Sequence, residues 1–151
     1  MKKEIVAVCC ALASVPSFAG DWVAGGATDS IDQFVDYSSI EQNNDTRGAW
    51  LIHVINRDKR GIAYTLSWAE HNCQSKKIRY MDYVHYDMAG KIIESGNEPT
   101  SWPRAIPGSI GETALKAICQ KEKPTVIFPN TSQEEVAEAI RKYRTSNGEW
   151  K

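Results

Sequence analysis

Large and small side chains alternate in the middle of the chain, from Ile62 to Ala69. Bulky apolar residues occupy the even positions there, and Ala, Thr and Ser occupy the odd ones. A repeat of two predicts a β-strand with large groups on one face and small groups on the other. Runs of β-branched and aromatic residues at 47–55 and 76–86 flank this segment, and the connections between the three are short enough for hairpins. The pattern therefore predicts an antiparallel sheet.

Weaker strand signals lie on either side of these three runs. Residues 91–95 follow a turn at Asp87–Gly90, while residues 21–24 and 33–37 supply two strands at the start of the chain. Residues 125–128, between two prolines, are a candidate for a further edge strand. The sheet is expected to have about six strands.

Two helices are predicted near the end of the chain, each opened by a capping signal. Ser109 precedes Glu112 by three residues, and Ser132 precedes Glu135 by the same spacing. In this arrangement the Ser hydroxyl accepts a hydrogen bond from an unpaired amide while the Glu reaches back. Apolar stripes follow on one side of each helix: Ile110, Ala114, Leu115 and Ile118 in the first, and Val136, Ile140 and Tyr143 in the second.

The first nineteen residues have the features of a signal peptide. Lys2 and Lys3 precede an apolar stretch at 5–15 that is too short to span a membrane, and small residues end at Ala19. Cys9 and Cys10 lie inside the apolar stretch, too early for a lipid-modified cysteine. We expect a soluble exported chain that begins at Gly20 and forms one domain over 20–151, with a C-terminal helical extension from about 121.

Only Cys73 and Cys119 remain once the leader is removed, so a single intramolecular pairing exists. Neither cysteine belongs to a C-x-x-C motif, and His71 is the only histidine close to either, which leaves a metal pair or a reactive thiol without support. Because Cys119 lies beside Leu115 on the apolar stripe, the bridge would staple the first helix to the sheet. The predicted fold class is α+β: an antiparallel sheet of about six strands with a disulfide-tethered helix packed on it, and a second C-terminal helix.

Charge and motif content narrow the function. The 151 residues include 18 Lys and Arg against 19 Asp and Glu, and removal of the leader leaves 16 against 18, so the chain is not a polybasic nucleic-acid binder. No nucleophile elbow, zinc-protease or phosphate-loop motif occurs, and capping explains Ser109. His53 and His85 lie on predicted strands but have no third ligand at a recognisable spacing. We therefore expect no catalysis, no metal and no cofactor.

The run at 76–86 has the densest mixture of basic and aromatic side chains. Strict alternation places Lys77, Arg79, Tyr83 and His85 on one face and Ile78, Tyr80, Val84 and Tyr86 on the other. Arg and Tyr are enriched at binding surfaces, so a protein-binding surface is predicted at Lys76, Lys77, Arg79, Tyr83 and His85. The alternative is a sheet face whose tyrosines pack under the first helix while the lysines are solvated.

Several short segments resemble, in order and spacing, the surface-adhesin protein E family of small exported bacterial proteins. They are Trp22-Val23, Val35-Asp36 with Ser39-Ile40, Ala49-Trp50-Leu51, Cys73 with Arg79, Gly90, Trp102, and Pro107-Gly108-Ser109 ahead of a helix ending in Cys119. The resemblance covers about 21–119 and implies an antiparallel sheet with a helix tied to it by a disulfide. The family's namesake binds host matrix and serum proteins at the bacterial surface, where it is held by a lipid anchor. A chain cut to Gly20 would lack that anchor, so the expected location is the bacterial periplasm or the cell surface.

Two functions from different classes follow from these observations. The first is an envelope binding protein that engages a protein partner, such as a host matrix or serum protein, without catalysis. The second is a periplasmic inhibitor or immunity-type protein that occludes an enzyme. Both require an exposed recognition surface and no catalytic group.

Overall fold

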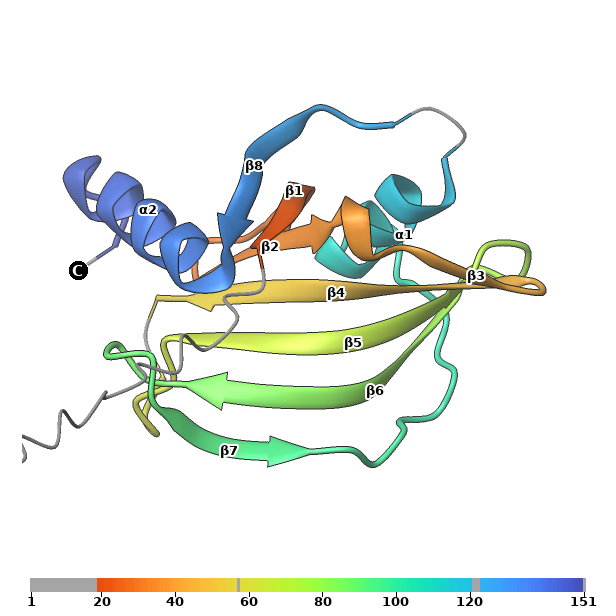
Figure 1. The fold of residues 1–151 in the computed structure, drawn as a ribbon, viewed down its shortest axis with the longest axis horizontal. Coiled ribbons are helices and arrows are strands. Elements are labelled where there is room, and N and C mark those ends of the chain that lie inside the picture. The colour runs from red at the N-terminus through yellow and green to blue at the C-terminus, as the bar shows by residue number, and fades with distance from the viewer. Residues whose placement is uncertain (1–18, 57, 121–122, 151) are drawn as a thin grey trace, which may run out of the picture.

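A computed structural model describes residues 19–56, 58–120 and 123–150, so all but the last residue of the predicted leader lie outside it. The described residues form one antiparallel sheet with the strand order β7-β6-β5-β4-β2-β1-β8, in which β3 pairs with β4 (Figure 1). The strands are β1 (Ala19–Ala27), β2 (Ile31–Asp36), β3 (Glu41–Asn43), β4 (Thr46–Ile55), β5 (Tyr64–Asn72), β6 (Lys77–Tyr86), β7 (Ile92–Gly96) and β8 (Val126–Ser132). The helices are α1 (Ile110–Cys119) and α2 (Gln133–Ser146), and a single 3-10 turn, η1 (Tyr37–Ser39), follows β2.

The described part of the chain has eight strands, so the expectation of about six was too low. One added strand is β3, a short polar segment that pairs with the start of β4 across a turn in which Asn44 has φ 51°. The other is β8, which includes residues 126–128 of the candidate edge segment and pairs with β1. The Trp22 indole also donates to the Thr131 carbonyl at 2.8 Å. The segment after the first helix therefore belongs to the same sheet as the start of the chain.

The two helices contact opposite faces of the sheet, as the alternation along β4 shows. Leu51 packs in one apolar cluster with Ile118 of α1, whereas its neighbour Ile52 packs in another with Val136 of α2. Successive strand residues point to opposite faces. We call the surface that contacts α1 the first face and the surface that contacts α2 the second face.

From Leu66 to Ala69 of β5 the small residues are more deeply buried than the large ones. Ser67 and Ala69 on the first face are 4% and 0% exposed, while Leu66 and Trp68 on the second face are only half-buried. Trp68 lies across Gly48 of β4, where a Cβ would come within 2.3 Å of the Trp68 ring. The small residues of β5 thus allow close packing on the first face, and the glycine of β4 makes room for an aromatic ring on the second face.

Cys73, in the turn after β5, is bonded to Cys119, the last residue of α1, which confirms the predicted disulfide. Their Cα atoms are 5.6 Å apart. Beside the bridge, Arg47 of β4 donates to the Ile118 carbonyl at 2.7 Å. The end of α1 is therefore held by a covalent bond and by a charged hydrogen bond to one of its terminal carbonyls.

Both predicted helix starts are confirmed. The Ser132 hydroxyl accepts from the Glu135 amide at 3.3 Å, and the Glu135 carboxylate accepts from the Ser132 amide at 2.9 Å, which completes a capping box. At α1 the Ser109 hydroxyl accepts from the Glu112 amide, but the Glu112 carboxylate accepts from the Gly108 amide instead of that of Ser109. These hydrogen bonds satisfy amides that a helix leaves unpaired at its start.

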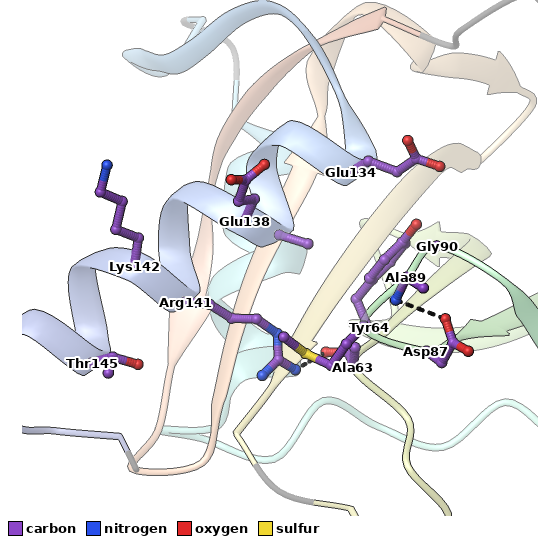
Figure 2. A pocket seen from close by; sticks show the side chains of 12 residues that line it. Ala63, Tyr64, Asp87, Ala89, Gly90, Glu134, Glu138, Arg141, Lys142 and Thr145 are labelled. Atoms are coloured by element: carbon purple, nitrogen blue, oxygen red, sulfur yellow. Dashed lines mark hydrogen bonds between the residues drawn. The ribbon is translucent and has the colours of Figure 1, made fainter.

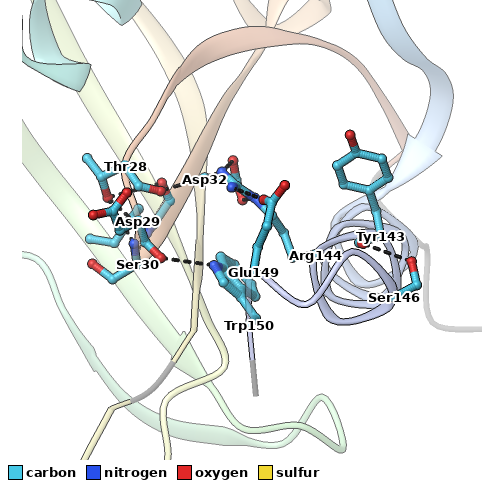
Figure 3. A network of polar contacts seen from close by, with 10 residues as sticks. Thr28, Asp29, Ser30, Asp32, Tyr143, Arg144, Ser146, Glu149 and Trp150 are labelled. Atoms are coloured by element: carbon cyan, nitrogen blue, oxygen red, sulfur yellow. Dashed lines mark hydrogen bonds and ion pairs between the residues drawn. The ribbon is translucent and has the colours of Figure 1, made fainter.

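A polar network fixes the end of α2 to the β1–β2 hairpin (Figure 3). Arg144 donates to both carboxylate oxygens of Asp32, at 2.8 and 2.6 Å, and also pairs with Glu149. Trp150 is 3% exposed, and its indole donates to the Asp29 carbonyl at 3.1 Å. The C-terminal residues are therefore part of the packed structure.

The buried His71 makes stability depend on pH. It is fully buried on β5, and its ring lies close to backbone groups of Arg47 and Ala69. Burial lowers the pKa of His71 to about 4, whereas it is 6.5 in the unfolded chain. Between these values the unfolded state binds a proton that the folded state excludes, so stability falls as the pH falls.

We predict that lowering the pH from 7.5 to 5 removes about 2 kcal/mol of unfolding free energy through His71 alone. Urea unfolding curves at both pH values measure the loss. The variant His71→Leu, which has a similar volume and cannot titrate, should lose correspondingly less stability over this range. An equal loss in the variant and in the unmodified chain would contradict the assignment.

Candidate functional site

A β-bulge at Met81 divides the predicted binding residues between the two faces of the sheet. Before it, Lys77 and Arg79 pair with Asn72 and Glu70 of β5 on the second face. After it, Tyr83 and His85 pair with Ser67 and Thr65, which lie on the first face. The predicted alternation, which placed all four on one face, was wrong because the bulge inserts one extra residue into β6.

Arg79 occupies a well-defined position on the second face. Its guanidinium forms an ion pair with Glu70 at 2.7 Å and lies 4.6 Å from the centre of the Trp102 ring. The side chain is 29% exposed, so one edge of the group is accessible. A charged group that is stacked and paired in this way loses little conformational freedom when it binds.

Tyr83 and His85 form a separate pair on the first face. Their rings lie 4.7 Å apart, and the His85 Nδ1 atom is 2.7 Å from the Thr65 hydroxyl. Burial, and then the charge of Arg60, lowers the pKa of His85. Tyr83 lies over Gly96 of β7, where a Cβ would come within 2.6 Å of its ring. Close packing against neighbouring residues therefore explains the positions of the Tyr83 and His85 side chains.

The segment between β7 and α1 continues the sheet beyond β6. The Ile78 amide donates to the Pro103 carbonyl at 3.1 Å, and the Ala105 amide donates to the Lys76 carbonyl at 2.9 Å. In Figure 1 this segment leads from the end of β7, past the β5–β6 end of the sheet, to α1. It thereby brings Trp102 over Arg79 and pairs Arg104 with Lys77.

A groove of about 430 Å³ lies between this segment and α1. Lys76, Arg104 and Lys116 contribute its cationic groups, and Ile106 and Leu115 contribute apolar surface. We call it the basic groove. Of the five predicted binding residues it contains Lys76 alone, which adopts φ 55° in the turn before β6.

A second hollow, of about 780 Å³, lies between α2 and the β6–β7 turn (Figure 2). Its charges are mixed: α2 contributes Glu134, Glu138, Arg141 and Lys142, and the β6–β7 turn contributes Asp87. The Arg141 guanidinium donates to the backbone carbonyls of Ile55 and Ala63, and burial lowers the pKa of Arg141. Arg141 therefore connects α2 to the β4–β5 connection.

The two histidines considered as metal ligands lie on the same face but do not meet. His53 and His85 pair with Thr65 from its two sides, and the His53 Nε2 atom is 2.7 Å from the Gln33 amide group. Within the described ranges no cluster of three metal-ligating side chains occurs. No helix among these residues is long and apolar enough to cross a membrane.

The sequence analysis did not assign a binding role to Trp102, Arg104 or Ile106. All three lie at 97–109, which has no periodic pattern, and only their backbone pairing with β6 positions them. The available signal was the clustering of Trp, Arg and a large apolar residue in a polar connection, a composition that is enriched at interfaces.

These features define a disulfide-bonded α+β protein that exposes charged and aromatic side chains at the start of β6. The family model of Surface-adhesin protein E matches residues 22–120, and the chain therefore belongs to this family. Among solved structures, crystal form II of Haemophilus influenzae protein E is similar, with 13% identity, a TM-score of 0.44, and coverage of 58% of this chain and 79% of that chain. Comparison with curated proteins gave no match.

Proposed function

We propose that this protein is an exported binding protein of the bacterial envelope that engages a protein partner and does not act as an enzyme. Family membership supports an adhesin-like surface protein. The proposal includes a leader at 1–19, a functional unit at 20–151, and a host matrix or serum protein as the partner. The pairing of β8 with β1 supports treating residues 20–151 as one unit.

The observation that carries the proposal is the stack of Arg79 on Trp102, with Glu70 fixing the guanidinium. Arg and Trp contribute more to binding energy than most residue types when they lie at the centre of an interface. Here both are partly accessible and already ordered, so a partner would not have to order them. Lys77, on the same face, and Lys76, in the turn before it, extend this surface with positive charge.

We predict that Arg79→Ala weakens binding of the partner about thirtyfold, or about 2 kcal/mol. Tyr83→Ala, on the first face, should change the affinity less than threefold, as expected for a residue outside the contact. A solid-phase assay against matrix and serum proteins, together with a pull-down from periplasmic extract, supplies the partner. Titration calorimetry then measures both variants.

Two controls make the comparison specific. Arg79→Lys keeps the charge but loses the planar stack, so it should recover only part of the affinity. Melting temperatures of all variants show whether a loss of binding reflects unfolding. Equal affinity of Arg79→Ala and the unmodified chain would eliminate the Arg79 surface, and capture of an enzyme that loses activity would favour an inhibitor over an adhesin.

A further inference from the structure

The basic groove is built from elements whose positions are fixed independently. One wall is the segment around Arg104, which hydrogen bonds to the start of β6 through the Lys76 carbonyl. The other wall is α1, whose end is bonded through Cys119 to the turn after β5. Because backbone hydrogen bonds and a disulfide set both walls, the groove is formed before any ligand arrives.

The charges in the groove are unbalanced in favour of cations. Lys76, Arg104 and Lys116 line it, and Glu112 is the one carboxylate among the described lining residues. Glu112 already accepts from the Gly108 amide at 3.0 Å and pairs with Lys116 at 3.1 Å. These contacts lower the pKa of Glu112, first through the Gly108 amide, and hold it ionised. Lys76 and Arg104 have no ion-pair partner among the described residues, and both are exposed.

Apolar surface lies beside these two exposed cations. The Ile106 side chain is 71% exposed, the largest exposed fraction among the bulky apolar residues described. Leu115 and Pro107 line the groove next to it. An exposed apolar group rimmed by like charges is typical of a binding site for a ligand that has an apolar centre and opposite charges.

We propose that the basic groove binds an acidic segment of a partner protein, with an apolar side chain placed against Ile106 and carboxylates beside Arg104 and Lys76. This inference rests on the proposed protein-binding function and names the chemistry of the partner. A nucleic acid fits less well, because the whole chain has a formal net charge of −1 and Glu112 lies in the groove.

A synthetic peptide tests the groove directly. Fluorescence anisotropy with the exported chain and a labelled acetyl-EDLEE-amide peptide should show saturable binding. The affinity should fall at least tenfold for Arg104→Glu, which places a carboxylate where the peptide carries one. Ile106→Ser, and a peptide with Ser in place of Leu, should each weaken binding several-fold. Lys142→Glu, an exposed charge reversal on α2, should leave it unchanged.

Three comparisons decide the result. Equal binding of acetyl-KKLKK-amide, tighter binding of a twelve-residue thymidine oligonucleotide, or equal affinity of Arg104→Glu and the unmodified chain would each overturn the proposal. Partner binding that depends on Arg79 is measured on the same proteins. If it persists while the acidic peptide does not bind, only the groove is wrong. If the peptide binds through Arg104 while no partner depends on Arg79, the groove stands and the Arg79 surface fails.

Discussion

Reduction of the Cys73–Cys119 bridge is expected to lower the unfolding free energy by about 4 kcal/mol and the melting temperature by about 10 to 15 °C. The bridge closes a loop with a sequence separation of 46 residues, and the loss of chain entropy in the unfolded state grows with loop length. Within that loop lie β6, β7 and the whole basic groove. Calorimetry of the protein with and without a reductant measures the effect.

The double variant Cys73→Ser, Cys119→Ser provides the control for this prediction. It should melt at about the temperature of the reduced chain and should not respond to the reductant. Thiol titration of the denatured, unreduced chain should find no free thiol. A melting temperature that does not change on reduction, or two titratable thiols, would contradict the prediction.

Local sequence patterns predicted the helices and strands that carry a clear signal within their own residues. Alternation located β5, a run of β-branched and aromatic residues located β4, and the Ser132–Glu135 spacing located α2. Pairing between strands determines the features that were missed. The short β3 contains no apolar residue and forms only because it pairs with β4. The bulge at Met81 has no glycine or proline to mark it, and it is visible only in the register with β5.

The candidate site could be predicted only in part for the same reason. Composition directed attention to the start of β6, where Lys77 and Arg79 lie on the strand and Lys76 lies in the turn before it. The bulge, however, moves Tyr83 and His85 to the other face. Trp102, which stacks on Arg79, and Ala105, which hydrogen bonds to Lys76, belong to a segment about twenty-five residues later in the chain, and no spacing rule connects this segment to β6. Long-range pairing therefore decided which side chains meet.

Long-range contacts also hold the end of the chain in place. We call Arg141, Arg144 and Trp150 the C-terminal anchor; they lie outside the segment matched by the family model. The cations of Arg141 and Arg144 lie 5.8 and 5.6 Å from the centre of the Trp150 ring. That ring packs in the apolar cluster of the second face with Ile52 and Val136. The anchor thus joins α2, the β1–β2 hairpin and the core.

Trp150→Ala should therefore destabilise the protein by about 3 kcal/mol, because it leaves a cavity in the second-face cluster and removes the hydrogen bond to Asp29. Tyr143→Ala is the matched control: it truncates an aromatic residue of α2 that is 60% exposed, so its cost should be no more than about 0.5 kcal/mol. Urea unfolding of both variants measures the difference.

Trp150→Ala should also leave the affinity for the partner unchanged, under conditions in which the variant remains folded. The reason is that Arg79 lies at the start of β6, away from the second-face cluster. Equal stabilities for the two variants would mean that Trp150 does not anchor α2, and a selective loss of binding would place the recognition surface at α2.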